Sequence, residues 1–146
     1  MSTIIKALID SDVILDLFLD RESFADQAER VFDKLAVARF EGYVTTAALL
    51  NIYYIARKTL GRIVALDCMR RLLETDGLEV LAVDKRQIQS ALNVPMSDFE
   101  DAVQAMAAEV AGLDYIVTRN KRDFYYSPIP AVSPEELLRK MDRDHF

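Results

Sequence analysis

The alternation of short apolar segments with amphipathic stretches is the feature that most constrains the fold of this chain. Residues 4–9, Ile-Ile-Lys-Ala-Leu-Ile, form a nearly continuous apolar run, which is typical of a central strand covered on both faces. Further strands are predicted at residues 43–45, 78–83, 114–118 and 131–132. Strands that alternate with helices predict a parallel sheet with helices on both faces, and therefore an α/β fold.

Capping residues and glycines predict where the helices begin and end. Asp12 is expected to cap a helix over 13–19, and Ser23 a longer helix that includes Phe40 and stops at Gly42. Four further helices are expected at 46–59, around 63–73, from Asp84 to about 93, and from Ser97 or Asp98 to 112. A last one begins at Ser133-Pro134, a cap followed by proline at the first helical position.

The helix predicted at 46–59 is too densely apolar for a helix with one buried face. Its residues 52–55, Ile-Tyr-Tyr-Ile, are therefore expected to pack partly against a second subunit. This pattern predicts a homodimer.

Length and composition limit the class of protein. A chain of 146 residues with 51% hydrophobic and 29% charged residues predicts one globular domain over 1–146. Its one cysteine, Cys68, and one histidine, His145, exclude an intrachain disulfide and a Cys/His zinc site. With neither a signal peptide nor a membrane segment recognisable, we expect a cytoplasmic protein without a membrane role. The net charge of −6 repels polyanions at long range, although a basic rim or bound cations can reverse this locally.

Four aspartates stand where a parallel sheet places its ligands, at the carboxyl ends of the strands. Asp10 follows the first strand and Asp123 lies shortly after the fourth, while Asp98 and Asp101 are three apart at a helix start and share one face. Such carboxylates repel one another unless a hard cation is present, so the pattern predicts Mg²⁺ or Mn²⁺. These ions activate water and clamp the oxygens of a phosphodiester.

Each of these acids also has a structural explanation. Asp98 fits a helix N-cap, and Asp101 fits the acidic first turn that favours the helix dipole. Asp10 can simply end a strand, and Asp123 can be a surface turn residue. The prediction of a metal site therefore depends on the four acids together.

Two segments carry a resemblance to a known family. Asp-Phe-Glu-Asp-Ala at 98–102, followed by Ile-Val-Thr-Arg-Asn-Lys-Arg-Asp-Phe at 116–124, resembles the PIN-domain family of metal-dependent ribonucleases. Residues 8–13 match that family's first motif and residues 129–137 its usual ending, so the resemblance covers essentially the whole chain.

The resemblance implies a three-layer α/β/α sandwich with a central, mostly parallel sheet. It also implies an acidic pocket that binds Mg²⁺ or Mn²⁺ and cuts single-stranded or structured RNA. Many small members are toxins of the VapC type, which an antitoxin protein holds inactive and which are usually dimeric. The family's residues carry over as metal ligands Asp10, Asp101 and Asp123, accessory acid Asp98, and loop-holding residues Thr118 and Asn120.

The chain departs from the family pattern at Asn51. Members commonly place a glutamate in the helix after the second strand, and the best alignment puts Asn51 there. A neutral amide accepts or donates hydrogen bonds but cannot supply charge to a metal or act as a general base. Asp98 or Asp12 are the candidates to compensate. The structural alternative is that Asn51 is a polar residue satisfied within a packed helix.

An acidic pocket needs basic groups nearby to bind phosphates. We expect Arg119 and Lys121, at the rim beside Asp123, to make these contacts. Other basic residues are equally explained as solvated surface charges; these are Arg57, Lys58, Arg62, Arg70, Arg71, Lys85, Arg86 and Arg122. Phe-Tyr-Tyr at 124–126 either stacks on unpaired bases or packs the loop against the core.

Three functions follow from these observations. The first is a metal-dependent endoribonuclease that uses Asp10, Asp98, Asp101 and Asp123. The second is a degenerate PIN domain, because of Asn51, that binds RNA or a protein partner without cutting. The third is a haloacid-dehalogenase-like phosphatase with Asp10 as nucleophile and Asp12 as acid/base, for which the chain lacks a convincing Gly-Asp motif.

Overall fold

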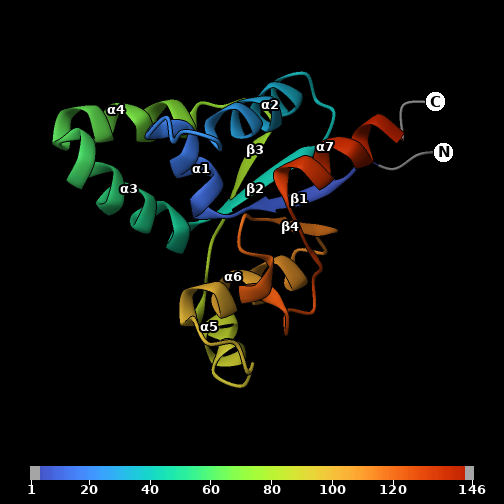
Figure 1. Ribbon diagram of the computed structural model, residues 1–146. Coiled ribbons are helices and arrows are strands. Elements are labelled where there is room, and N and C mark those ends of the chain that lie inside the picture. The colour runs from blue at the N-terminus through green and yellow to red at the C-terminus, as the bar shows by residue number, and fades with distance from the viewer. Residues whose placement is uncertain (1–3, 144–146) are drawn as a thin grey trace.

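Within residues 4–143, which the computed structural model describes, five strands form one parallel sheet at the centre of the molecule (Figure 1). The strands are β1 (Lys6–Ile9), β2 (Glu41–Thr45), β3 (Leu78–Leu81), β4 (Tyr115–Val117) and β5 (Ala131–Val132). Their order is β3-β2-β1-β4-β5, and every neighbouring pair runs parallel. The predicted α/β class and parallel sheet are confirmed.

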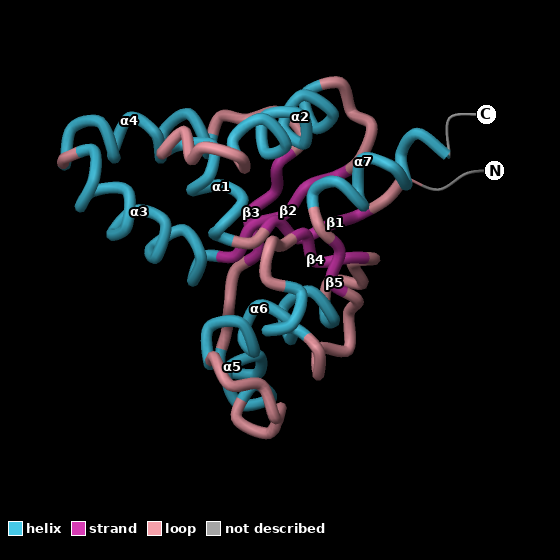
Figure 2. The backbone as a smooth tube through the Cα atoms, in the orientation of Figure 1, coloured by secondary structure: helices cyan, strands magenta, loops and turns pink. Residues whose placement is uncertain are grey.

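Helices cover both faces of this sheet (Figure 2). One face carries α1 (Ser11–Phe18), α2 (Ala25–Ala36), α3 (Thr46–Leu60), α4 (Arg62–Leu73) and α7 (Pro134–Arg143). The other carries α5 (Lys85–Ala91), α6 (Phe99–Val110) and the short 3₁₀ helix η1 (Lys121–Phe124). The result is the three-layer sandwich that the family resemblance implies.

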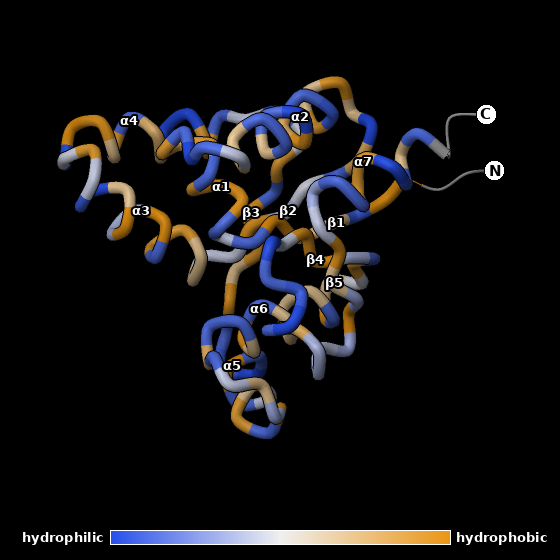
Figure 3. Tube along the Cα trace, viewed as in Figure 1, coloured by the Kyte–Doolittle hydropathy of each residue, from blue (hydrophilic) through white to orange (hydrophobic). Residues whose placement is uncertain are grey.

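The central strand β1 is buried on both sides. Ala7 and Ile9 point into the core beneath α1 to α4, whereas Leu8 points into the core beneath α6. All three side chains are inaccessible to solvent, so an apolar run without alternation is what this position requires. Hydropathy mapped on the backbone shows the strands as mainly apolar and the outer helices as mixed (Figure 3).

Two helix boundaries differ from the prediction. Asp10, rather than Asp12, caps α1, because its side chain accepts a hydrogen bond from the backbone N–H of Ser11 at 2.8 Å. The second helix begins after Phe24 and ends at Ala36, so it neither starts at Ser23 nor continues to Phe40. Ser23 has φ of 75°, outside the extended conformation that an N-cap adopts.

The end of α2 depends on a left-handed residue that is not glycine. Ala38, with φ of 59°, turns the chain just after the helix. Phe40 then packs into the core from the approach to β2, and Gly42 lies inside that strand. The helical spacing that includes Phe40 was therefore a misleading signal.

The remaining boundaries are close to prediction. Asp84 caps α5 and Asp98 caps α6, each through its side-chain oxygen.

Cys68 is half-buried. None of the helices in the described part of the chain has the length and apolar character that crossing a membrane requires. His145 lies outside the described residues.

Candidate active site

Asp10 is a buried acid at the carboxyl end of the sheet. It directly follows β1, and its side chain and backbone together are only 7% exposed. Besides Ser11 N–H, its carboxylate accepts hydrogen bonds from Gln104 Nε2 at 3.0 Å and Thr118 Oγ1 at 2.9 Å. Burial raises the pKa of Asp10 above its usual value, while these three hydrogen bonds oppose that rise.

A cavity of about 310 Å³ opens beside Asp10. Six carboxylates, two guanidinium groups and several polar or apolar side chains line it: Asp10, Ser11, Asp12, Leu15, Arg21, Asn51, Ile55, Asp98, Glu100, Asp101, Arg119, Asn120 and Asp123. The structure thus brings the four predicted acids to one cavity, together with Asn51, Arg119 and Asn120. Glu100, Arg21 and Ser11 are lining residues that the sequence analysis did not select.

The N-cap and first turn of α6 contribute three of the acids. Asp98 accepts a hydrogen bond from the backbone N–H of Asp101 at 2.9 Å, so it is the predicted N-cap and also lines the cavity. Burial, followed by repulsion from Asp10, raises the pKa of Asp101 to about 8. The same two causes raise the pKa of Glu100 to about 7. These raised pKa values favour the protonated form of both carboxyls in a pH range where isolated carboxyls are ionised.

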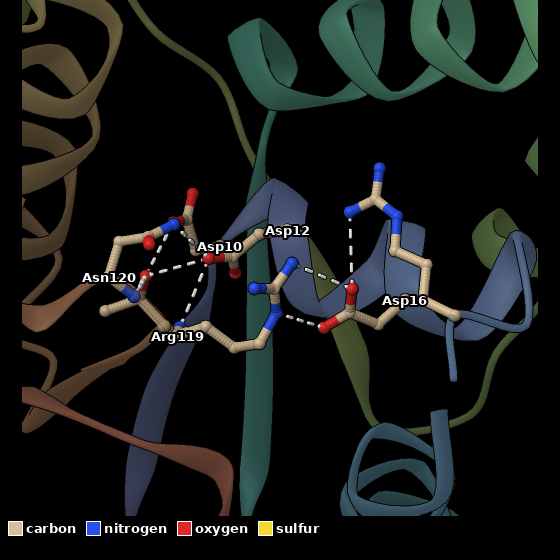
Figure 4. A network of polar contacts seen from close by, with 7 residues as sticks. Asp10, Asp12, Asp16, Arg119 and Asn120 are labelled. Carbon is tan, nitrogen blue, oxygen red and sulfur yellow. Dashed lines mark hydrogen bonds and ion pairs between the residues drawn. The ribbon is translucent and has the colours of Figure 1, made fainter. Parts of the chain in front are cut away.

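Asp12 ties the loop after β4 to helix α1 (Figure 4). Its Oδ2 accepts hydrogen bonds from Asn120 Nδ2 at 2.8 Å and from the backbone N–H of Arg119 at 3.2 Å. It also lies 3.2 Å from Thr118 Oγ1, whose single hydroxyl hydrogen is shared with Asp10. Burial, then repulsion by Asp10, raises the pKa of Asp12 to about 6. Thr118 and Asn120 thus contact acids of the site, as residues that hold this loop would.

The two basic residues predicted to bind phosphate have different positions. Arg119 lines the cavity and forms an ion pair with Asp16, at 2.6 Å from Nε to Oδ2. This hydrogen bond raises the pKa of Arg119 above its usual value. Lys121 is instead paired with Glu136 of α7 at 2.7 Å and is not among the residues that line the cavity. A carboxylate from α7 thus holds the ammonium group of Lys121 outside the cavity in this structure, and its contact with phosphate stays a prediction.

Asn51 reaches the cavity from α3, opposite the acids of α6. Its side chain is half-buried and lines the cavity with Ile55, one turn further along the helix. The structure thus places Asn51 at the cavity, and its match to the family's glutamate position stays a prediction. It supplies a neutral amide where a glutamate would add a seventh carboxyl group to the lining.

The aromatic residues after Asp123 divide between core and surface. Phe124 packs against Leu8 and α6, whereas Tyr125 and Tyr126 are exposed and form an edge-to-face pair with centroids 5.0 Å apart. Packing against the core is therefore observed for Phe124, whereas stacking of the two exposed tyrosines on unpaired bases stays a prediction.

The donor set is suitable for a hard divalent cation but is not assembled into a closed site. Nowhere in residues 4–143 do three histidine, cysteine, aspartate or glutamate side chains already lie at the spacing of a metal centre. The cavity nevertheless offers carboxylates with raised pKa values and two buried oxygens without a hydrogen-bond partner in this part of the chain, Ser11 Oγ and Asp12 Oδ1. Oxygen donors of this kind are those that Mg²⁺ and Mn²⁺ prefer.

The parallel three-layer sandwich and the acidic cavity at the carboxyl ends of its central strands define a class of α/β domains in which carboxylates from distant segments share one site. Comparison with protein families shows which family of this class the chain belongs to. The model of a PIN domain family matches residues 6–122, and the chain belongs to the PIN-domain family. Membership of this family decides against the phosphatase interpretation of Asp10 and Asp12.

Known proteins with similar sequence or structure extend over most of the chain. Ribonuclease VapC1 of Aquifex aeolicus is 24% identical over 143 residues, which cover 92% of this chain and 94% of that protein. The DNA-bound VapBC structure from Salmonella typhimurium has a TM-score of 0.69 at 19% identity and covers 90% of this chain and 99% of its own. Mycobacterium tuberculosis VapC20, described as a sarcin-ricin loop cleaving toxin, has a TM-score of 0.63 at 13% identity and covers 75% and 86%. The two structures show the likeness in fold.

Proposed function

We propose that this protein is a metal-dependent endoribonuclease of the VapC type. The observation that carries the proposal is the convergence of Asp10, Asp101 and Asp123 on one cavity of a PIN-domain chain. The name of the Aquifex relative, Ribonuclease VapC1, and the description of VapC20 as a toxin that cleaves the sarcin-ricin loop support RNA as the substrate. The protein acts in this proposal as one cytoplasmic domain.

The chain's own residues would divide the work as follows. Asp10, Asp101 and Asp123 hold the divalent ion, and Asp98 caps α6 and fixes the backbone of Asp101. Gln104 and Thr118 orient the carboxylate of Asp10 by hydrogen bonds. Bound Mg²⁺ or Mn²⁺ supplies charge neutralisation and a water of lowered pKa for hydrolysis of the phosphodiester.

The proposal includes an antitoxin partner. The similar structures from Salmonella typhimurium and Klebsiella pneumoniae are described as a VapBC and a toxin-antitoxin complex. A homodimer also belongs to the proposal, since Leu50 and Tyr54 expose large apolar surface on α3. Sedimentation of the purified chain, alone and with Tyr54→Lys, measures that assembly.

Cleavage of a mixed RNA pool tests the proposed activity. The wild-type chain should shorten the RNA in Mn²⁺ or Mg²⁺ and leave it intact in EDTA, whereas Asp101→Asn should lose at least most of the activity. Asp76→Asn makes the same chemical change in an exposed turn and should cleave like wild type. RNA left intact by the wild-type chain in both metals would refute the proposal.

Asn51 supports a second candidate function. In this alternative the chain is a PIN domain that binds RNA or a protein partner without cutting RNA. The amide lines the cavity where it adds no charge for a cation. RNA binding that is unaffected by Mn²⁺, with no turnover, would select this function over the nuclease.

A further inference from the structure

Two arginines that line the acidic cavity bind one buried aspartate, Asp16, which Figure 4 shows beside Arg119. Arg119 binds the carboxylate of Asp16 with two N–H groups, Nε to Oδ2 at 2.6 Å and Nη2 to Oδ1 at 3.0 Å. Arg21 binds the same Oδ1 through Nη1 at 3.2 Å. The Asp16 side chain is only 2% exposed, whereas those of Arg119 and Arg21 are 24% and 34% exposed. A buried carboxylate thus holds two partly exposed cations, which we call the arginine pair.

Asp16 balances only one of the two positive charges of the arginine pair. One carboxylate faces two guanidinium groups, in a chain whose net charge is −6. Other ion pairs in the described part of the chain match one cation with one acid; Lys121–Glu136 and Arg71–Asp67 are examples. Both members of the arginine pair also line the cavity that contains the acids. Positive charge is therefore placed at the acidic cavity, where the carboxylates alone would repel a polyanion.

Both guanidinium groups are held before any ligand arrives. Arg119 lies over the ring of Phe24, with 4.0 Å from its central carbon to the ring centroid. Arg21 sits in the turn after α1, where its backbone N–H donates to Asp16 O at 3.1 Å. Asp20 and Ser23, on either side of it, adopt positive φ values of 47° and 75°. A turn that keeps two non-glycine residues in this disfavoured region fixes the position of Arg21.

Most of the hydrogen-bonding capacity of the pair remains available. An arginine has five N–H donors, of which Arg119 uses two on Asp16 and Arg21 uses one. Planar guanidinium groups bind phosphate oxygens with two parallel N–H bonds, and pre-orientation reduces the entropy lost on binding. The remaining N–H groups of the two arginines are therefore suited to bind the oxygens of a phosphate.

We propose that Arg21 and Arg119, held by Asp16, form a clamp for an RNA phosphate next to the one that is cleaved. This inference rests on the proposed ribonuclease function and adds its substrate-binding element. An acidic protein segment fits less well, because its neighbouring carboxylates would face the six acids of the same cavity. In an RNA strand, the neighbouring phosphate is the group that the metal site receives. Asp16 is a positioning residue in this scheme.

Salt-dependent RNA binding tests the clamp. In an Asp101→Asn background, which prevents cleavage, binding of a short fluorescein-labelled oligouridylate is followed by anisotropy at several NaCl concentrations and constant Mg²⁺. Arg21→Gln should weaken binding about tenfold, equivalent to about 1.4 kcal/mol. It should also reduce the slope of log K against log[salt] by about 0.7, the value for one lost single-strand phosphate contact. Arg71→Gln removes the same charge from a distant exposed pair and should change neither.

Two further variants separate a clamp from a diffuse positive field. Arg21→Lys keeps the charge and loses the planar fork, so it should keep the salt slope but bind more weakly. Asp16→Asn makes the cluster more positive, so a diffuse field predicts tighter binding. The clamp predicts weaker binding, because the arginines lose the group that orients them. Arg21 is partly exposed, so its variants remain informative if Asp16→Asn fails to fold.

The outcomes distinguish the clamp from the nuclease. Equal affinities and salt slopes for Arg21→Gln and Arg71→Gln overturn the clamp, whether or not the wild-type chain cleaves RNA. Failure of the Asp101→Asn chain to bind the oligouridylate overturns it as well. Binding that depends on Arg21, in a protein that never cleaves RNA in Mn²⁺, supports the clamp and overturns the proposed nuclease.

Discussion

Replacing Asp101 by asparagine is expected to make the metal-free protein more stable, although it should remove the proposed activity. Asp101 lies among acids that repel it, with Asp10 the strongest. Its backbone N–H is bonded to Asp98, and the substitution leaves that bond in place. The neutral amide therefore removes repulsion from the cavity without leaving a broken side-chain contact among the described residues.

The pKa of Asp101 sets the size of this effect. A rise from 3.8 to about 8, at 1.36 kcal/mol per unit, gives a ceiling of roughly 6 kcal/mol. Asp101 is only half-buried, and solvent and salt screening reduce the stabilisation to about 1–2 kcal/mol. Loss of the favourable interaction between its charge and the N-terminus of α6 subtracts about 0.5 kcal/mol. A net gain of about 1 kcal/mol corresponds to an increase in Tm of roughly 2–4 °C.

The gain should depend on pH in a definite direction. Below pH 3.8 the carboxyl is protonated in both folded and unfolded chains and costs nothing. Between 3.8 and about 8 the unfolded chain loses this proton before the folded chain does, so the wild type loses stability as pH rises. The Tm difference between Asp101→Asn and wild type should be near zero at pH 4 and largest at pH 8.

Thermal unfolding by circular dichroism in EDTA, from pH 4 to pH 8, measures this difference. Asp76→Asn, in an exposed turn, is the matched control and should follow the wild-type curve. Added Mn²⁺ should raise the Tm of wild type at pH 8, because a ligand of the folded state stabilises it, and should raise that of Asp101→Asn much less. A lower Tm for Asp101→Asn in EDTA at pH 8, or equal responses to Mn²⁺, would refute the electrostatic account of the cavity.

Two other substitutions test the cavity and the packing that supports it. Asn51→Glu adds a carboxylate to the lining, so it should lower the Tm in EDTA at pH 8 and increase Mn²⁺ affinity measured by calorimetry. Asn51→Gln introduces a neutral side chain of the same length as glutamate. It should change neither the Tm in EDTA nor the Mn²⁺ affinity. Gly77→Ala should cost about 1–3 kcal/mol in urea unfolding, because φ is +83° and the added Cβ would lie 2.9 Å from Leu35 O. Gly112→Ala, with a φ of +69° and no atom within 4 Å, should cost less; equal losses would contradict the role of Leu35.

Local patterns were sufficient to predict the sheet and the acidic cavity. The apolar run of β1 records burial on both faces, and the position of Asp10 after it follows from the chain itself. Asp98 was recognisable as an N-cap because capping is a local interaction. The convergence of Asp10 with Asp101 and Asp123 could be inferred because parallel strands bring their carboxyl ends to one edge.

The partners of the basic residues could not be predicted in this way. Arg119 and Lys121 are two positions apart, yet their carboxylates come from α1 and α7, 103 and 15 residues away in sequence. The end of α2 could not be predicted from the sequence either, because Ala38 adopts a left-handed conformation that is usually marked by a glycine. Both features depend on tertiary contacts. Glu100 could have been predicted as a residue of the cavity, because it lies in the same first turn as Asp101.

Helix α1 links the acidic cavity to the arginine pair. Asp12 and Asp16 are four residues apart on this helix, so they lie on one face, about 6 Å apart along the helix axis. Both bind the same residue of the loop after β4: Asp12 accepts the backbone N–H of Arg119, and Asp16 accepts its guanidinium. The distance between the acids and the proposed phosphate clamp is therefore set by a single turn of helix. A substitution that displaces this loop, such as Asp12→Ala, should disturb RNA binding and metal binding together, whereas Arg21→Gln should affect RNA binding alone.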